Sequence, residues 1–429
     1  MPTETGVFAA GTSDITPERP VPLAGFRDRR GVFAGVNDPL ELNALVCRGP
    51  AGLVALVSAD LLFVTRELKS RVLERLSGRG APSGDPCGLS EERFVLAATH
   101  THSAPAVDSG KPMLGRADEG YVELVVERAA ALLGRLADAA RRPGTVGYAS
   151  GMADHSVNRR RPGWEVNRRS LPHRTILAAP NPQGPRDETI HVVLLADDGG
   201  RVGCVLWSYA CHPVGFPALD RVSADYPGVV RARLRARFGA DLPAIYLPGF
   251  AGDVRPRSVE GPRPFRQRLR EIVSGPLFVQ FPAGAYSAWA STLAERVVDI
   301  ASGAMPGRPL RAVACTASLP LARILVDARP DQTVTFQRLS LAADLHFAAV
   351  SAEPVAGQAA LLAGLWDGVV IPVGCIDTVF GYLPTGRMLA EGGYEVEDFR
   401  EPFGVRSAFR AELDHEVRAG WEQLTRAAP

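Results

Sequence analysis

Short apolar runs and longer segments of helical periodicity alternate along most of the chain. A β-rich run at 52–64 precedes helical spacing at 65–78, and residues 119–142 give the clearest amphipathic helix. Further strands are expected at 93–99, 190–196, 202–209, 243–248 and 340–350, and further helices at 226–238, 287–303, 356–367 and 405–421. This alternation predicts an α/β (α+β) fold with a mixed β-sheet core covered by helices. No internal repeat or low-complexity linker divides residues 1–429, so one large domain is expected.

Two long stretches break this pattern and are expected to be loops. Residues 155–188 carry seven arginines against three acids, and residues 255–285 are rich in proline, arginine and phenylalanine. Loops longer than about 12–15 residues in a compact domain are usually functional or disordered. An arginine-rich loop is most often only solvated. Because the first stretch follows a candidate catalytic region, we expect both to border a binding site.

Composition and charge point to an ordinary globular protein. Hydrophobic residues make up 46% and charged residues 22%, and the net charge is +1, so neither nucleic acid nor a membrane surface is an expected partner. No window approaches the roughly 18 apolar residues of a membrane span, and the N-terminus lacks the pattern of a signal peptide. The six cysteines are scattered without a C-x-x-C pair. Reduced thiols in a cytoplasmic protein are therefore expected.

The first candidate for chemistry is the sequence FVLAATHTHSAP at 94–105, which places His100 and His102 at the end of an apolar strand. Residues i and i+2 of a strand share a face, and open α/β sheets bind ligands at strand ends. An H-x-H pair alone leaves three interpretations open: metal ligands, acid and base groups, or ordinary loop residues.

Three later segments add candidates. His212 follows an apolar strand in SYACHPVGFP, Glu353 ends a strand in LHFAAVSAEPVAG, and Tyr382 and Tyr394 lie in the glycine-rich TVFGYLPTGRMLAEGGYEVEDF. An unpaired carboxylate at a buried strand end is costly to desolvate, so Glu353 is expected to have a partner. Taken singly, each has a structural alternative: a hydrogen-bonded histidine, a helix-capping glutamate or a core tyrosine.

These segments together resemble the neutral/alkaline (non-lysosomal) ceramidase family, zinc-dependent amidases that hydrolyse the N-acyl bond of ceramide. The resemblance rests on eight pieces in order: GTSDITPERPVPLAGF, VSADLLFV, ATHTHSAP, VNRRRP, YACHP, LPGFAGDVRP, AEP and the paired-tyrosine loop GYLPT…GGYEV. They span most of the chain and imply the catalytic fold of that family.

Carried over by position, the resemblance implies a zinc ion held by His100, His212, Glu353 and Tyr382, with water in an open position. It implies that His102 moves the proton of that water or of the leaving amine. It also implies that Arg159 and Tyr394 bind the substrate carbonyl or the oxyanion.

Three departures from the family limit what the resemblance implies about the substrate. Its GDVSP serine is Arg255 here, its separate C-terminal immunoglobulin-like domain is not expected, and the export signal common in the family is not recognised. Arginine pairs bidentately with carboxylate or phosphate, so a polar or anionic substrate is expected. The arginines expected to contribute are Arg255 and Arg160, together with Arg159, Arg161, Arg168 and Arg169.

The sequence therefore predicts a zinc-dependent amidohydrolase of a bacterial pathway, acting on a small, polar or anionic N-acyl compound. An ester or lactone hydrolase, an acyltransferase on the same site, and a genuine ceramidase remain alternatives. A TIM-barrel amidohydrolase with a bridging lysine is excluded because no lysine follows Lys111. Members of that class that need no lysine are not excluded. A serine hydrolase lacks its G-x-S-x-G elbow. A non-catalytic zinc scaffold would keep the same residues, and the sequence fixes no oligomeric state.

Overall fold

A large mixed sheet forms the centre of the computed structural model, which describes residues 5–27, 29–49, 52–78, 88–165, 173–259 and 263–426. Its strands run in the order β12 (Ala244–Pro248), β10 (Val202–Tyr209), β9 (Thr189–Asp197), β6 (Arg142–Met152), β1 (Val7–Asp14), β3 (Glu41–Gly49), β4 (Gly52–Ala59) and β5 (Phe94–Ala98), with β14 (Pro306–Pro309) paired to β6. The pairs β10–β12 and β4–β5 are parallel and the others are antiparallel.

A smaller sheet packs on one face of the large sheet. It runs β15 (Val313–Pro320), β16 (Thr333–Ala342), β17 (Leu345–Val350) and β19 (Val369–Val373). On β4, Val54 and Leu56 join the core shared with β16 and β17, whereas Leu53, Ala55 and Val57 join the core under the helices. Alternate side chains of a strand point to opposite faces, so one apolar strand serves both cores.

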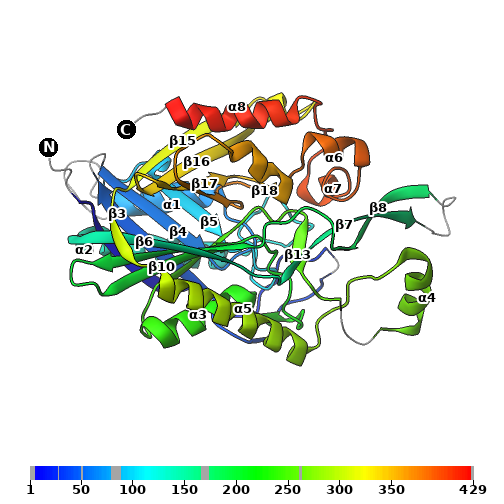
Figure 1. The fold of residues 1–429 in the computed structure, drawn as a ribbon, viewed down its shortest axis with the longest axis horizontal. Coiled ribbons are helices and arrows are strands. Elements are labelled where there is room, and N and C mark those ends of the chain that lie inside the picture. The colour runs from blue at the N-terminus through cyan, green and yellow to red at the C-terminus, as the bar shows by residue number, and fades with distance from the viewer. Residues whose placement is uncertain are drawn as a thin grey trace.

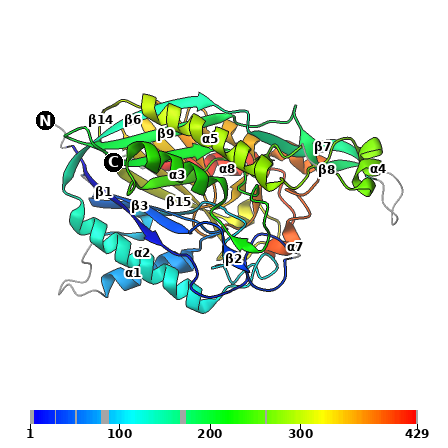
Figure 2. The same ribbon diagram turned by 90° about the horizontal axis from the view of Figure 1, so that it is seen from below.

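Helices cover both outer faces of this pair of sheets (Figures 1 and 2). The outer face of the large sheet is covered by α1 (Arg66–Ser77), α2 (Glu119–Ala139), α3 (Asp225–Phe238) and α5 (Ala283–Gly303). The outer face of the small sheet is covered by α8 (Leu413–Arg426), whose Trp421 packs on Phe336. The result is a layered helix–sheet–sheet–helix arrangement, which confirms the predicted mixed sheet core covered by helices.

Local sequence explains where α1 and α2 begin. Thr65 and Asp118 are their N-caps, and each side chain accepts a hydrogen bond from the backbone N–H three residues on, at 3.0 Å in both cases. On α1, Leu68, Val72 and Leu76 recur every four residues and are buried. The helices predicted at 65–78 and 119–142 are thus confirmed, as are the strands predicted at 190–196, 202–209 and 243–248.

The remaining elements lie near the ends of the strands. The 3₁₀ turns are Glu91–Arg93, Leu321–Arg323 and Ala356–Leu362, and the short helices are α4 (Phe265–Ser274), α6 (Gly386–Glu391) and α7 (Arg400–Phe403). The short strand pairs are β2 (Gly35–Val36) with β11 (Arg221–Val222), and β18 (Glu353–Pro354) with β20 (Tyr382–Leu383). The strand predicted at 340–350 is instead a hairpin, because a turn at 343–344 separates β16 from β17. The helix predicted at 356–367 is mostly the third 3₁₀ turn.

The two stretches predicted to be loops contain regular structure. Within 155–188, β7 (Ser156–Glu165) and β8 (His173–Asn181) pair antiparallel, and β13 (Val254–Pro256) adds to β7. This ribbon projects with α4 from one end of the molecule (Figures 1 and 2). Its strands lack the apolar alternation of a core strand, so backbone pairing alone defines them. Arg168 and Arg169 lie outside the described residues.

Among the described residues, none of the helices has both the length and the apolar character that a membrane crossing requires.

A buried ion pair connects α1 to the segment after β19. Lys69 Nζ lies 3.2 and 3.3 Å from the two carboxylate oxygens of Asp377, and both side chains are almost completely buried. Replacing Lys69 with methionine is expected to cost about 3–5 kcal/mol of unfolding free energy, because the carboxylate would remain buried and uncompensated. Urea denaturation measures this. The double variant Lys69→Met/Asp377→Asn should recover most of the loss, and a single variant as stable as the wild type would contradict the assignment.

Candidate metal centre

Two histidines reach the site from strands that stand near opposite edges of the large sheet, β5 and β10. His100 follows β5 and has a left-handed backbone, with φ of 69°. That conformation is uncommon for histidine. It is held by hydrogen bonds from the His100 N–H to the Leu61 carbonyl (2.9 Å) and from the Thr99 N–H to the Ala59 carbonyl (2.8 Å). His212 follows β10, and its N–H donates to the Val254 carbonyl at 3.1 Å. Because β12, the neighbour of β10, contacts β4 and β5, the segments after β5 and β10 meet although the two strands are far apart in the strand order.

Backbone carbonyls fix the tautomers of three histidines. The Nδ1 atom of His100 lies 2.9 Å from the Leu62 carbonyl, that of His212 lies 2.7 Å from the Ala251 carbonyl, and that of His102 lies 2.9 Å from the Gly25 carbonyl. A carbonyl only accepts, so each Nδ1 carries the proton and donates it. Each Nε2 then presents a lone pair. Such a carbonyl partner is the usual outer contact of a metal-bound histidine.

The three Nε2 lone pairs converge. One ligand atom from each of His100, His102 and His212 falls within 4.8 Å of the others, and the Nε2 atoms of His100 and His212 are 3.1 Å apart. Two unprotonated nitrogens have no hydrogen to share at that distance. The arrangement therefore favours an added positive charge between them, a proton or a metal ion.

A carboxylate joins the same point. Glu353 Oε2 is 3.1 Å from His212 Nε2 and 3.3 Å from His100 Nε2. Burial would raise the pKa of the Glu353 carboxyl, but the two histidines outweigh it and hold that pKa well below its usual range. Glu353 therefore has the partner that its strand-end position predicted, and it brings a negative charge to the imidazole cluster.

The pKa directions of the histidines also suit a cation. Burial lowers the pKa of His212 to about 4 and that of His102 well below its usual value, so both are neutral near pH 7. Burial acts to lower the pKa of His100 as well, but Cys375 and Glu353 outweigh it and raise that pKa. The cluster therefore favours one added positive charge. Nitrogen and oxygen donors of this kind suit zinc, so the residues present fit the ion that the sequence predicted.

Tyr382 lies beside Glu353 because the two residues are register partners in the parallel β18–β20 pair. Its ring stacks on His212, with 6.5 Å between centroids and 12° between planes. Burial and the Glu353 carboxylate raise the pKa of Tyr382 well above its usual value. The phenol is thus adjacent to the cluster, where the sequence placed it, and it stays protonated unless a metal ion displaces the proton.

Arg159 and Tyr394 lie on the other side of Tyr382. The Arg159 guanidinium lies over both tyrosine rings, 5.4 Å from the centroid of Tyr382 and 5.3 Å from that of Tyr394. Its Nε donates to Glu395 at 2.7 Å, and one terminal nitrogen is buried with no hydrogen-bond partner. Burial acts to lower the pKa of Arg159, but Tyr382 and Glu395 outweigh it, so the group is charged. Its buried terminal nitrogen is left with an N–H to donate.

Arg160 faces away from this group. It donates to Glu395 at 2.7 Å, to Glu391 at 3.3 Å and to the Gly392 carbonyl at 2.8 Å. These contacts join its guanidinium to the loop that carries Tyr394, and a substrate contact of Arg160 stays a prediction. Glu395, which holds both arginines, was not a candidate from the sequence, although it directly follows Tyr394.

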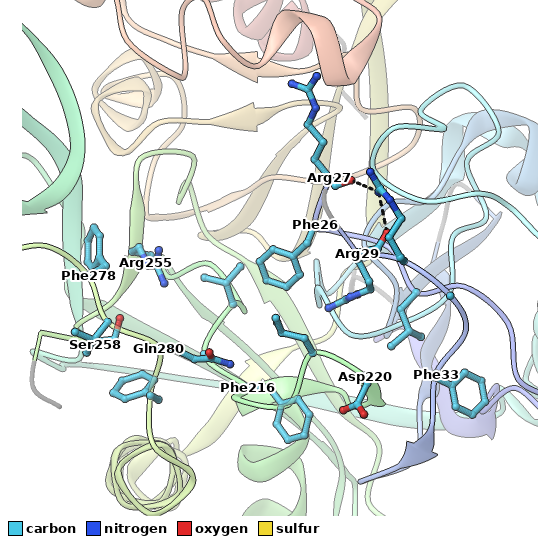
Figure 3. A pocket seen from close by; sticks show the side chains of 18 of the residues that line it. Phe26, Arg27, Arg29, Phe33, Phe216, Asp220, Arg255, Ser258, Phe278 and Gln280 are labelled. Atoms are coloured by element: carbon cyan, nitrogen blue, oxygen red, sulfur yellow. Dashed lines mark hydrogen bonds between the residues drawn. The ribbon is translucent and has the colours of Figure 1, made fainter. Parts of the chain in front are cut away.

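A cavity of about 630 Å³ adjoins the histidine cluster (Figure 3). Phe26 lines it, with its ring 5.2 Å from that of His102, and Arg29 in its wall donates to the His102 carbonyl at 2.9 Å. Arg255 lines the cavity too, with its guanidinium 4.3 Å from the ring centroid of Phe278. Of these residues, only Arg255 was a candidate from the sequence. Phe26 ends the GTSDITPERPVPLAGF segment that carries part of the resemblance, whereas Arg29, in the residues that follow, gave no signal beyond its charge.

Comparison with known proteins supports the fold. No protein-family model matches the chain, and no curated protein matches it. Among solved structures, the neutral ceramidase from Pseudomonas aeruginosa is similar, with a TM-score of 0.73 and 16% identity over 99% of this chain and 75% of that chain. A ceramidase complexed with C2 gives the same TM-score and coverage at 15% identity. The chain therefore has a ceramidase-like fold.

Proposed function

We propose that the protein is a zinc-dependent hydrolase that cleaves the amide bond of an N-acyl compound. The observation that carries this proposal is the gathering of His100, His102 and His212, with one ligand atom of each within 4.8 Å of the others, next to Glu353 Oε2, which lies 3.1 Å from His212 Nε2 and 3.3 Å from His100 Nε2. His100, His212, Glu353 and Tyr382 would hold the ion. The ceramidase-like fold supports amide hydrolysis as the reaction class.

Zinc bound there would polarise the scissile carbonyl and acidify water. His102 is the base in this proposal, because its Nε2 is buried without a hydrogen-bond partner and its low pKa leaves it neutral. It accepts a proton from the attacking water as the oxygen–carbon bond forms. It then returns that proton to the nitrogen as the C–N bond breaks, which gives a carboxylic acid and an amine.

Arg159 and Tyr394 stabilise the oxyanion. The terminal nitrogen of Arg159 that lacks a partner supplies an N–H. Burial raises the pKa of Tyr394 to about 12, so its hydroxyl remains a hydrogen-bond donor at neutral pH. Hydrogen-bond donors that are already in position before the reaction are the main source of oxyanion stabilisation in enzymes.

The alternative functions differ in how well they fit this site and this fold. Esters, lactones and acyl transfer would use the same groups, and ceramide itself remains a candidate substrate. The TIM-barrel alternative does not fit the antiparallel pairs of the large sheet. A scaffold without activity would not need the unpartnered His102 Nε2 and the unpartnered Arg159 nitrogen beside the cluster.

Metal removal and restoration tests the proposal. Turnover would be measured on a panel of N-acyl amides, from ceramide to short carboxylate-bearing compounds, with matched esters. Chelation is expected to lower amide turnover by about a thousandfold, and one equivalent of Zn²⁺ should restore it. Full turnover by protein shown to be metal-free would refute zinc dependence, and turnover of esters alone would refute the amide assignment.

A further inference from the structure

The cavity beside the metal centre contains an arginine that lacks a counter-ion among the described residues. Arg255 stands on β13, and its Nε is buried with no hydrogen-bond partner. Among the described residues, its guanidinium stacks on the ring of Phe278. Arg255 is partly buried, and even partial burial of a guanidinium without a carboxylate is costly, because desolvation is not offset by a paired charge.

Arg29 enters the same cavity from the opposite wall (Figure 3). One terminal nitrogen donates to the carbonyls of Ala24 (2.6 Å) and His102 (2.9 Å), while its Nε and other terminal nitrogen are buried with no partner. Burial lowers the pKa of both arginines to about 10, so both are charged near pH 7. Donors on both guanidinium groups are therefore unused.

The other charged residues of the cavity wall do not neutralise this pair. Arg27 pairs with Glu401 at 3.0 Å, with both side chains exposed, and Arg30 adds a further positive charge. Asp220 is exposed and lies next to Phe33, apart from Arg255 (Figure 3). The described wall is thus positive between Arg29 and Arg255.

Around these charges the wall is aromatic. The aromatic side chains that line it are Phe26, Phe33, Phe216, Phe278 and Phe281. Such a wall buries the apolar surface of a ligand, and the few polar groups in it determine how the ligand is oriented. Arginine suits an oxyanion because its planar fork donates two parallel hydrogen bonds to a carboxylate or phosphate.

We propose that the substrate carries an oxyanion, a carboxylate or a phosphate, bound in this cavity by the unused donors of Arg255 and Arg29, on an apolar body that packs against the phenylalanines. This inference rests on the proposed function, since the cavity adjoins the proposed catalytic groups. It makes Arg255 and Arg29 residues that determine specificity.

Substrate pairs that differ only in charge test the proposal. One pair is N-phenylacetylglycine and its glycinamide, with the charge on the amine side, and the other is the monoanilide of glutaric acid and its carboxamide, with the charge on the acyl side. Wild-type enzyme should prefer the carboxylate of at least one pair by about tenfold to a hundredfold in kcat/KM, mainly through KM. Arg255→Gln and Arg29→Gln should each bring that ratio near one. Arg255→Lys should keep part of the preference, and Arg233→Gln, an exposed arginine on α3, should keep all of it. Equal use of both members of both pairs by the wild type would overturn the proposal.

Binding without turnover separates this inference from the proposed function. Titration of phenylacetate, phenyl phosphate and phenylacetamide into the protein, followed by calorimetry or NMR, needs no catalysis. Saturable binding of either anion, absent for the amide and lost in Arg255→Gln, would support the site even if no amide were cleaved, and would show which oxyanion it prefers. No binding of either anion by folded wild-type protein would overturn the site even if amide turnover were found.

Discussion

Replacing His212 with alanine is expected to lower amide turnover by about a thousandfold or more and to remove the bound metal. His212 Nε2 is within 3.1 Å of both His100 Nε2 and Glu353 Oε2, so its loss removes a side chain that contacts two of the other three proposed ligands. A lost metal removes both carbonyl polarisation and water activation, which together account for several kcal/mol of the barrier.

Steady-state kinetics and elemental analysis on the same preparation measure both effects. His415→Ala is the matched control, because that side chain is 80% exposed on α8 and should leave turnover and metal content at the wild-type level. A folded His212→Ala enzyme that retains stoichiometric metal and more than about a tenth of wild-type turnover would contradict the ligand assignment.

Replacing Arg159 with glutamine is expected to lower kcat by about 10²–10³, or roughly 2.7–4 kcal/mol of transition-state stabilisation. The unpartnered terminal nitrogen of Arg159 is the donor that this substitution removes. The metal content should stay at the wild-type level, because Arg159 contacts only one of the four proposed ligands, Tyr382, and does so over the face of its ring.

The pattern of constants separates an oxyanion donor from a substrate-binding group. A drop in kcat with little change in KM is the expected pattern, because the interaction forms only in the transition state. Arg387→Gln is the control, since that arginine is 89% exposed on the nearby α6. If Arg159→Gln raised KM tenfold and left kcat unchanged, Arg159 would bind the ground state and the proposed role would be wrong.

Strong periodicity made most of the sheet and the larger helices predictable. Strands buried on both faces, such as β10 and β12, read as continuous apolar runs, and α2 shows a broad apolar stripe. The β7–β8 ribbon was missed because it packs on no core along most of its length, and its arginines gave a loop-like sequence. The hairpin at β16–β17 was read as one strand because its turn is only two residues long.

The candidate site was predictable where chemistry-bearing residues follow strands. His100, His212 and Glu353 were found in this way, and they converge as the resemblance implied. The sequence could not predict the hydrogen-bond partners of the histidine ring nitrogens. The carbonyls of Gly25, Leu62 and Ala251 decide which nitrogen of each histidine faces the cluster, and any residue type could provide them. Glu395 and Arg29 were missed for the same reason, since their roles depend on contacts far apart in sequence.

The central claim is that His100, His212, Glu353 and Tyr382 hold one zinc ion. Elemental analysis of protein purified without chelators or affinity metals tests it most directly. We predict about one zinc per chain, retained through dialysis and removed only by a strong chelator. Wild-type protein that is folded yet contains no zinc, and that takes up none from a stoichiometric supply, would contradict the claim.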